Sequence, residues 1–124
     1  MLRQAQKYVG MDYVAGEFDC ADLAVLVQRE LFGREVPLPA TRRRPGGARG
    51  QAREINLWRD ALAVPIDAPV TGCAVLLSEP DGGGRTWHVG TVFMDAHQAW
   101  VLHNNFAQGS AALQCGQPRE IYRF

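Results

Sequence analysis

The chain has 124 residues, of which 47% are hydrophobic and 21% charged, and its 13 basic and 13 acidic residues cancel. This length predicts a single domain, residues 1–124, with one packed core. A net charge of zero gives no electrostatic reason to expect nucleic acid or an anionic membrane as a partner. No apolar run approaches the roughly 20 residues that span a bilayer. The segment MLRQAQKYVG has no hydrophobic signal core, so we expect cytoplasmic synthesis without a signal peptide.

The first third of the chain predicts two helices separated by turns. Residues 1–10 suggest a short helix that ends near Gly10, and MDYVAGEF follows as a turn-rich stretch. Asp19 is a good N-cap, and Asp22 places negative charge in the first turn. Gly33 is a natural C-terminal stop. Between them, apolar residues recur at helical spacing, at Cys20, Leu23, Ala24, Val27 and Leu31.

The rest of the chain predicts a loop, a second helix and then strands. Residues 34–50 are rich in proline, glycine and arginine. The arginine-rich loop 42–53, which overlaps their end, reads either as a flexible loop or as a lid that contacts an anion. Residues 51–63 suggest a helix. CAVLLS, TWHVGTVFM, AWVLH and EIYRF then read as short strands. The order predicts an α+β fold, with N-terminal helices packed on an antiparallel β-sheet meander.

The three cysteines are far apart and form no CxxC pair. Their spacing argues against a zinc knuckle or a thioredoxin-like motif, and we expect all three thiols to be reduced. Cys73 and Cys115 read as core residues. No metal site and no cofactor are expected from this pattern.

Two of the three histidines fall in consecutive predicted strands, joined by a tight turn around 95–98. Because side chains alternate along a strand, a loop with an even number of residues puts His88 and His103 on one face, opposite each other or one diagonal apart. Two-residue turns dominate short hairpins, which favours this even case. His97 lies in the turn and should be solvated.

Cys20 would meet both imidazoles if its helix packed its apolar stripe on the same face. The three side chains would then be a nucleophile, a base and a group that orients the base. The start of a helix lowers a thiol pKa from about 8.5 by up to several units. Its free amides can also stabilise a tetrahedral oxyanion. The alternative is a buried structural cysteine and two histidines that simply complete the sheet.

VGMDYVAGEFDCADLAVLVQRELFG, followed by LP, HVGTVF and VLHN, resembles the NlpC family of papain-like cysteine peptidases, which act on bacterial cell walls. The resemblance runs from about Val9 to His103, in the order cysteine, histidine, polar residue. It implies Cys20 as nucleophile, His88 as general base and His103 as the residue that orients the base. The implied reaction is amide hydrolysis in peptidoglycan stem peptides, between D-glutamate and the diamino acid, through a thioester acyl-enzyme.

The resemblance also implies substrate-binding positions. Tyr13 matches a tyrosine that lines the family's active site, and Asp19 matches the acid before the nucleophile. Ala21 and Asp22 stand where many members have Ser-Gly, a position that contacts the stem peptide. A small stand-alone chain resembles the phage and prophage tail-associated branch, which implies phage tail proteins as partners and delivery to the cell wall by the tail.

Two other functions remain open from the sequence. The substitutions at Ala21 and Asp22 are compatible with a catalytically idle structural or assembly protein of a phage tail. Cys20, His88 and His103 are also three residues of types that bind zinc, and a fourth, open position would suit a catalytic metal.

Overall fold

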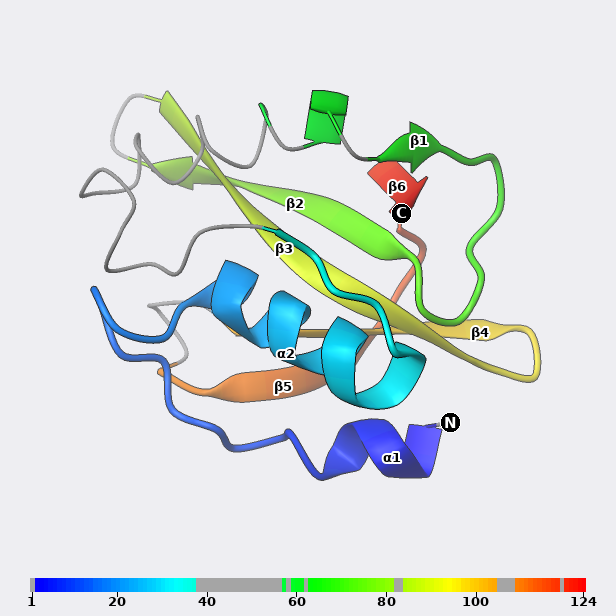
Figure 1. Cartoon of the computed structure of the whole chain (residues 1–124), viewed down its shortest axis with the longest axis horizontal. Helices are drawn as coiled ribbons and strands as arrows, with labels where there is room; N and C mark the ends of the chain where they lie inside the picture. Colours follow the sequence, from blue (N-terminus) through cyan, green and yellow to red (C-terminus); the bar gives the residue numbers. More distant parts are fainter. Residues whose placement is uncertain are drawn as a thin grey trace.

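The computed structural model describes residues 2–37, 57, 59–61, 63–81, 84–104, 109–118 and 120–124, without the side chains of 78–81 and 84–87. Its elements are α1 (Leu2–Gln6), α2 (Cys20–Phe32), β1 (Val64–Pro65), β2 (Ala74–Asp81), β3 (Gly84–Asp95), β4 (Gln98–Asn104), β5 (Ala111–Cys115) and β6 (Glu120–Arg123). The strands form one antiparallel sheet in the order β1-β6-β2-β3-β4-β5 (Figure 1). The predicted α+β class is confirmed.

Helix α2 begins and ends where the sequence predicts. The Oδ1 atom of Asp19 accepts the amides of Ala21 and Asp22 at 3.1 and 3.2 Å, and Oδ2 of Asp22 accepts the amide of Asp19 at 3.0 Å. This reciprocal capping box fixes the first turn. Gly33 ends the helix in the left-handed conformation, with φ of 64°. The capping box therefore places Cys20 as the first helical residue.

The other predicted helices differ in extent or lie outside the described residues. Helix α1 ends at Gln6 and continues as a turn to Gly10. Within the helix predicted over 51–63, the structure describes residues 57, 59–61 and 63. Residues 57 and 59–61 are helical and residue 63 is not. The arginine-rich segment 42–53 lies outside the described residues.

The sheet is only partly a meander. Strands β2, β3, β4 and β5 pair in chain order, as predicted, but β6 returns to the far side of β2, with Ala74 opposite Tyr122. Strand β1 then pairs with β6. The C-terminal strand therefore lies beside β2, four strands away from β5, instead of extending the meander.

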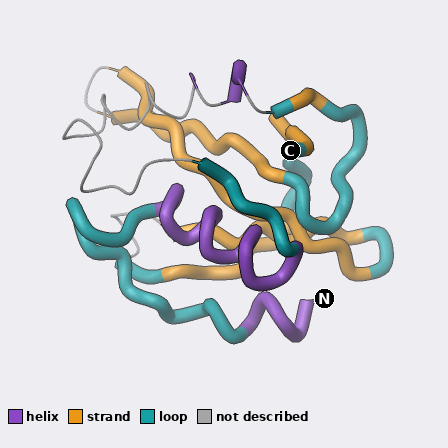
Figure 2. The backbone as a smooth tube through the Cα atoms, viewed as in Figure 1, coloured by secondary structure: helices purple, strands orange, loops and turns teal. Residues whose placement is uncertain are grey.

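Helix α2 covers one face of this sheet (Figure 2). Leu23 and Val27 pack with Phe93 and Leu102, in a cluster that also contains Ala5, Tyr8 and Ala111. The first turn of α2 packs on the β2–β3 pair, in a cluster of Cys20, Ala21, Ala24, Ala74, Leu76 and Val89. The reverse face carries a third cluster, made of Cys73, Val75, Val92, Ala99, Val101 and Ile121. The sheet is therefore apolar on both faces, with α2 on one of them.

No helix in the described part of the chain is both long and apolar enough to cross a membrane.

Candidate functional site

The β3–β4 hairpin brings His88 and His103 together. Asp95 pairs with Gln98, so the turn contains two residues, Ala96 and His97, and His97 is exposed as predicted. The pairing of Thr91 with Leu102, continued along the strands, sets Gly90 opposite His103. His88 is then one diagonal away on the same face, which confirms the predicted register.

The two imidazoles form a close, buried pair. Their ring centroids are 5.3 Å apart and their planes are inclined by 19°. His88 is 6% exposed and His103 is 4% exposed. The last residue pair of the β3–β4 ladder is Thr91 with Leu102, so both histidines lie beyond the point where these strands are paired. The pair therefore sits at the end of the hairpin that is remote from the turn.

Glycine at position 90 makes this arrangement possible. A Cβ atom built on Gly90 would lie 2.7 Å from Cγ1 of Val101 and 3.1 Å from the carbonyl oxygen of Leu102. It would also lie 3.3 Å from Cβ of His103. A contact below 3.0 Å requires the Val101 side chain to move, and the contact at 3.1 Å requires the β4 backbone to give by a few tenths of an ångström beside the histidines.

Cys20 approaches this end of β3 from the other face of the sheet. It is 1% exposed and packs in the same cluster as Val89, the residue that follows His88. Because side chains alternate along β3, Val89 points to the face that α2 covers and His88 to the reverse face. The expectation that the apolar stripe of α2 packs on the histidine face is therefore wrong.

The physical reason lies in the apolar area on each face. The α2 face offers Phe93 and Leu102, both fully buried large side chains, opposite the helix stripe. The reverse face offers the smaller Val92 and Val101 at this level, and the two imidazoles lie beyond them. Burying the larger apolar area stabilises the fold more. The structure thus brings Cys20 and His88 to one end of β3, but from its two faces.

The N-cap of α2 uses backbone amides of the first turn that could otherwise donate to an oxyanion. Asp19 is 3% exposed, and its side chain takes the amides of Ala21 and Asp22 while its carbonyl oxygen takes the amide of Leu23. The helix start was expected to offer its free amides to an oxyanion. The amides of Ala21 and Asp22 do not fit this expectation, because the cap already uses them. The amide of Cys20 takes no part in the cap, and it is the first-turn amide adjacent to the thiol.

The predicted substrate-binding residues have varied surroundings. The capping box accounts for Asp19 and Asp22 without a substrate. Ala21 is fully buried in the first turn of α2, where the helix packs on the sheet. Tyr13 is half-buried, and its amide donates to the carbonyl oxygen of Gly109 at 2.9 Å, which holds the segment before α2 against the start of β5. Tyr13 therefore keeps a partly accessible side chain near the helix start, and its role in binding stays a prediction.

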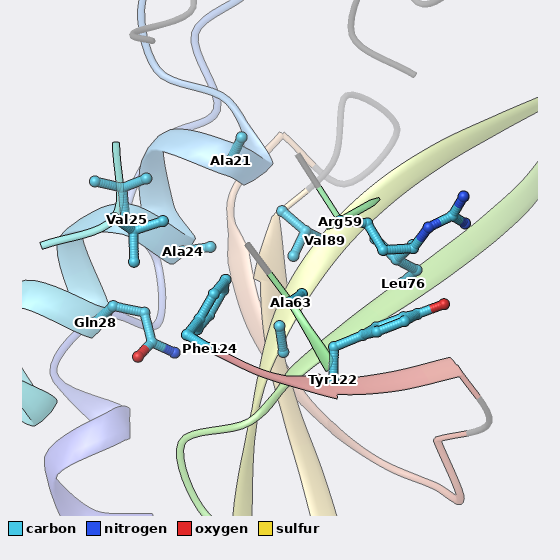
Figure 3. Close-up of a pocket in the computed structure, with 12 residues that line it drawn as sticks. Ala21, Ala24, Val25, Gln28, Arg59, Ala63, Leu76, Val89, Tyr122 and Phe124 are labelled. Carbon is cyan, nitrogen blue, oxygen red and sulfur yellow. The ribbon is translucent and has the colours of Figure 1, made fainter. Parts of the chain in front are cut away.

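A small cavity lies on the α2 side of the sheet, beside the first turn of the helix (Figure 3). Its volume is about 30 Å³. Its lining is Ala21, Ala24, Val25, Gln28, Val36, Arg59, Ala63, Ala74, Leu76, Val89, Tyr122 and Phe124. Of the predicted site residues only Ala21 lines it, and the imidazole pair is on the opposite face.

Two polar residues near the histidines escaped sequence analysis. Oε1 of Gln114 lies 2.7 Å from Nε2 of His103. Asn104 is fully buried, and neither its Nδ2 nor its Oδ1 has a hydrogen-bond partner among the described residues. Asn104 could have been noticed from the sequence, because it follows His103 directly. Gln114 could not, because finding it required the pairing of β5 with β4.

The described residues do not form the zinc site considered above. Among them, and they include Cys20, His88 and His103, no three His, Cys, Asp or Glu side chains are arranged to hold a metal ion. The donor geometry therefore argues against the zinc alternative.

None of the three cysteines, all of which the structure describes, forms a disulfide, but their surroundings differ. Cys73 is buried as predicted, and burial raises the pKa of its thiol. Cys115 is exposed, which corrects the prediction that it is a core residue. It ends β5, the edge strand of the sheet, where no further strand covers it.

Comparisons of the chain with protein-family models, with curated proteins and with solved structures found no match. The functional argument therefore depends on the residues and on the geometry of this end of the sheet.

Proposed function

We propose that the chain is a papain-like cysteine hydrolase of the NlpC type, which cleaves amide bonds in peptidoglycan stem peptides. The observation that carries the proposal is the buried imidazole pair of His88 and His103 at the end of β3. Cys20, the first residue of a capped helix, packs at the same end of that strand. A thiol at a helix start and two histidines make up the residue set of a thiolate–imidazole nucleophile.

Each of the three residues then has a defined role in the reaction. The proposal requires Cys20 and His88 to meet past the last residue pair of the β3–β4 ladder, where His88 takes the proton from Sγ of Cys20 and the thiolate attacks the amide carbon. The C–N bond breaks as His88 returns that proton to the leaving amine, which leaves a thioester on Cys20. His88 next takes a proton from water, and the hydroxide releases the acid and restores the thiol. His103 orients His88 throughout.

Digestion of purified peptidoglycan fragments tests this function. Incubation with the protein should yield products with a new free amino group on the diamino acid, identified by mass spectrometry. These products locate the cut at the bond between D-glutamate and the diamino acid. Intact fragments after prolonged incubation with folded protein would contradict the proposal.

A second candidate function is that of a catalytically idle structural protein in a phage tail. The observation that favours it is the burial of Cys20, which is 1% exposed within an apolar cluster. A nucleophile must reach its substrate, and buried structural cysteines are inert. In this case the histidine pair would only complete the sheet.

Alkylation of the cysteines at different pH values separates the two candidates. With a hydrolase, iodoacetamide should modify Cys20 at about pH 6, because the helix start and His88 stabilise its thiolate. Cys73 should stay unmodified at this pH, since burial raises its thiol pKa and so lowers its thiolate fraction. Exposed Cys115 serves as the accessible reference, and its reaction should accelerate as the pH rises.

The same experiment on His88→Ala completes the comparison. A hydrolase loses the early reaction of Cys20 in this variant, because the proton acceptor is gone. If Cys20 stays unmodified in the folded wild-type protein while Cys115 reacts, the idle structural function is supported instead.

A further inference from the structure

We propose that Gln114 is a positioning residue, which holds the proton of His103 on Nε2 and thereby keeps Nδ1 as a hydrogen-bond acceptor beside His88. The catalytic meaning of this role rests on the proposed function. The hydrogen bond and the tautomer that it selects do not, because they depend only on the geometry of β4 and β5.

The register of β4 and β5 brings the two side chains together. His103 pairs with Ala112, and Val101 pairs with Gln114, so His103 and Gln114 are diagonal neighbours on one face. Ala112 is short and leaves the space between them open. The amide Oε1 of Gln114 reaches to 2.7 Å from Nε2 of His103. This distance is that of a well-formed hydrogen bond.

This contact determines the tautomer of the ring. The amide of Gln114 is oriented with Oε1 toward the ring, and an amide oxygen only accepts, so in this orientation Nε2 of His103 donates and carries the hydrogen. A neutral imidazole has a single N–H, which leaves a lone pair on Nδ1. Nδ1 is buried and has no hydrogen-bond partner among the described residues. The structure thus holds a buried acceptor in reserve, on a ring whose centroid is 5.3 Å from that of His88.

Such an acceptor is what a histidine base needs at one moment of the reaction. When His88 takes the thiol proton, both of its ring nitrogens carry hydrogen. The lone pair on Nδ1 of His103 can then accept a hydrogen bond from the imidazolium and stabilise it. If the proton of His103 moved to Nδ1, two N–H groups would oppose each other, and the imidazolium would lose this support.

Among the described neighbours of His103 on this face, Gln114 decides which ring nitrogen carries the hydrogen. The other described residues on the same face near His103 are Gly90, Val92, Val101 and Ala112, and none of them is charged. His88 is the titratable neighbour on that face, and Cys20 comes from α2 on the other. Without Gln114, no described side chain would favour one ring nitrogen of His103 over the other.

Three variants test the inference. Gln114→Met keeps the length of the side chain but removes the acceptor, Gln114→Glu keeps an acceptor oxygen, and Gln117→Met makes the same change at another exposed glutamine. Long-range ¹H–¹⁵N NMR spectra at about pH 8.5, where an ordinary imidazole is neutral, report the tautomer of His103. We expect Nε2–H in the wild type, in Gln114→Glu and in Gln117→Met, and a mixture of tautomers in Gln114→Met.

Hydrolysis of stem peptides adds a second readout. Gln114→Met should lower kcat about tenfold with KM unchanged, the effect of losing one positioning hydrogen bond. Gln114→Glu should restore kcat at the same pH, which a merely bulky or apolar contact would not do. An Nδ1–H tautomer in the wild type, or a tautomer that Gln114→Met leaves unchanged, would overturn the inference. If the tautomer shifts as expected but the wild type cleaves nothing, the proposed function fails and the role of Gln114 at His103 stands.

Discussion

Cys20→Ala is expected to reduce the hydrolysis of stem peptides about a thousandfold or more, because it removes the sulfur that forms the thioester in the proposed mechanism. The substitution deletes a sulfur from a cluster of small and apolar residues, so the fold should survive. Initial rates on purified peptidoglycan fragments, measured beside circular dichroism spectra, check both parts of this expectation. The exposed Cys115→Ala is the matched control and should retain full activity.

His88→Ala should produce a loss of similar size, and the double variant should lose little more than either single one. Residues that act as one catalytic unit show this non-additivity, because removal of either member disables the same step. Two independent losses that multiply would show that Cys20 and His88 do not act together. Hydrolysis that continues unchanged in Cys20→Ala would rule out the thioester mechanism altogether.

The features that the sequence predicts correctly are local. The N-cap at Asp19 and the stop at Gly33 define α2, because capping depends on residues within one helical turn. The shared face of His88 and His103 follows from a two-residue turn and from side-chain alternation. Both arguments use chemistry that neighbouring residues complete by themselves.

The features that the sequence does not predict depend on distant contacts. Alternation separates His88 from Val89, but it does not say which of them α2 covers. That choice follows from the apolar area of Phe93 and Leu102 against the helix stripe. Strand β5, with the sequence AALQC, has no aromatic or β-branched residue to signal it. Without β5, neither the exposure of Cys115 nor the contact of Gln114 with His103 could be foreseen.

At the start of α2, the sequence supports two predictions that need the same backbone amides. The sequence contains both halves of the capping box, Asp19 and Asp22, and the same first turn was expected to donate amides to an oxyanion. One amide hydrogen cannot serve fully as a cap and as an oxyanion donor. In the structure the cap takes the amides of Ala21 and Asp22, so the two expectations compete and the structural one prevails.

Gly90→Ala is expected to damage both the fold and the histidine pair. The added Cβ would lie 2.7 Å from Cγ1 of Val101 and 3.1 Å from a backbone oxygen, and the oxygen cannot move without moving β4. Overpacking of this kind lowers the free energy of unfolding by about 1–3 kcal/mol. Urea unfolding measures this loss. Gly116→Ala is the matched control, because a Cβ at Gly116 meets nothing within 4 Å, and it should change stability by less than about 0.5 kcal/mol.

The activity of Gly90→Ala separates a packing role from a catalytic one. Moving β4 away from β3 would displace His103 from His88, since its Cβ lies 3.3 Å from the new methyl group. A displacement of about 1 Å at a catalytic group costs about a hundredfold in rate. Rates should therefore be compared in dilute buffer at a temperature where the urea curves show that the variant is fully folded. A folded Gly90→Ala protein with the wild-type rate would show that the spacing of the two imidazoles does not matter for hydrolysis. A folded but slow variant, beside an unaffected Gly116→Ala, would place the origin of the loss at the imidazole pair itself.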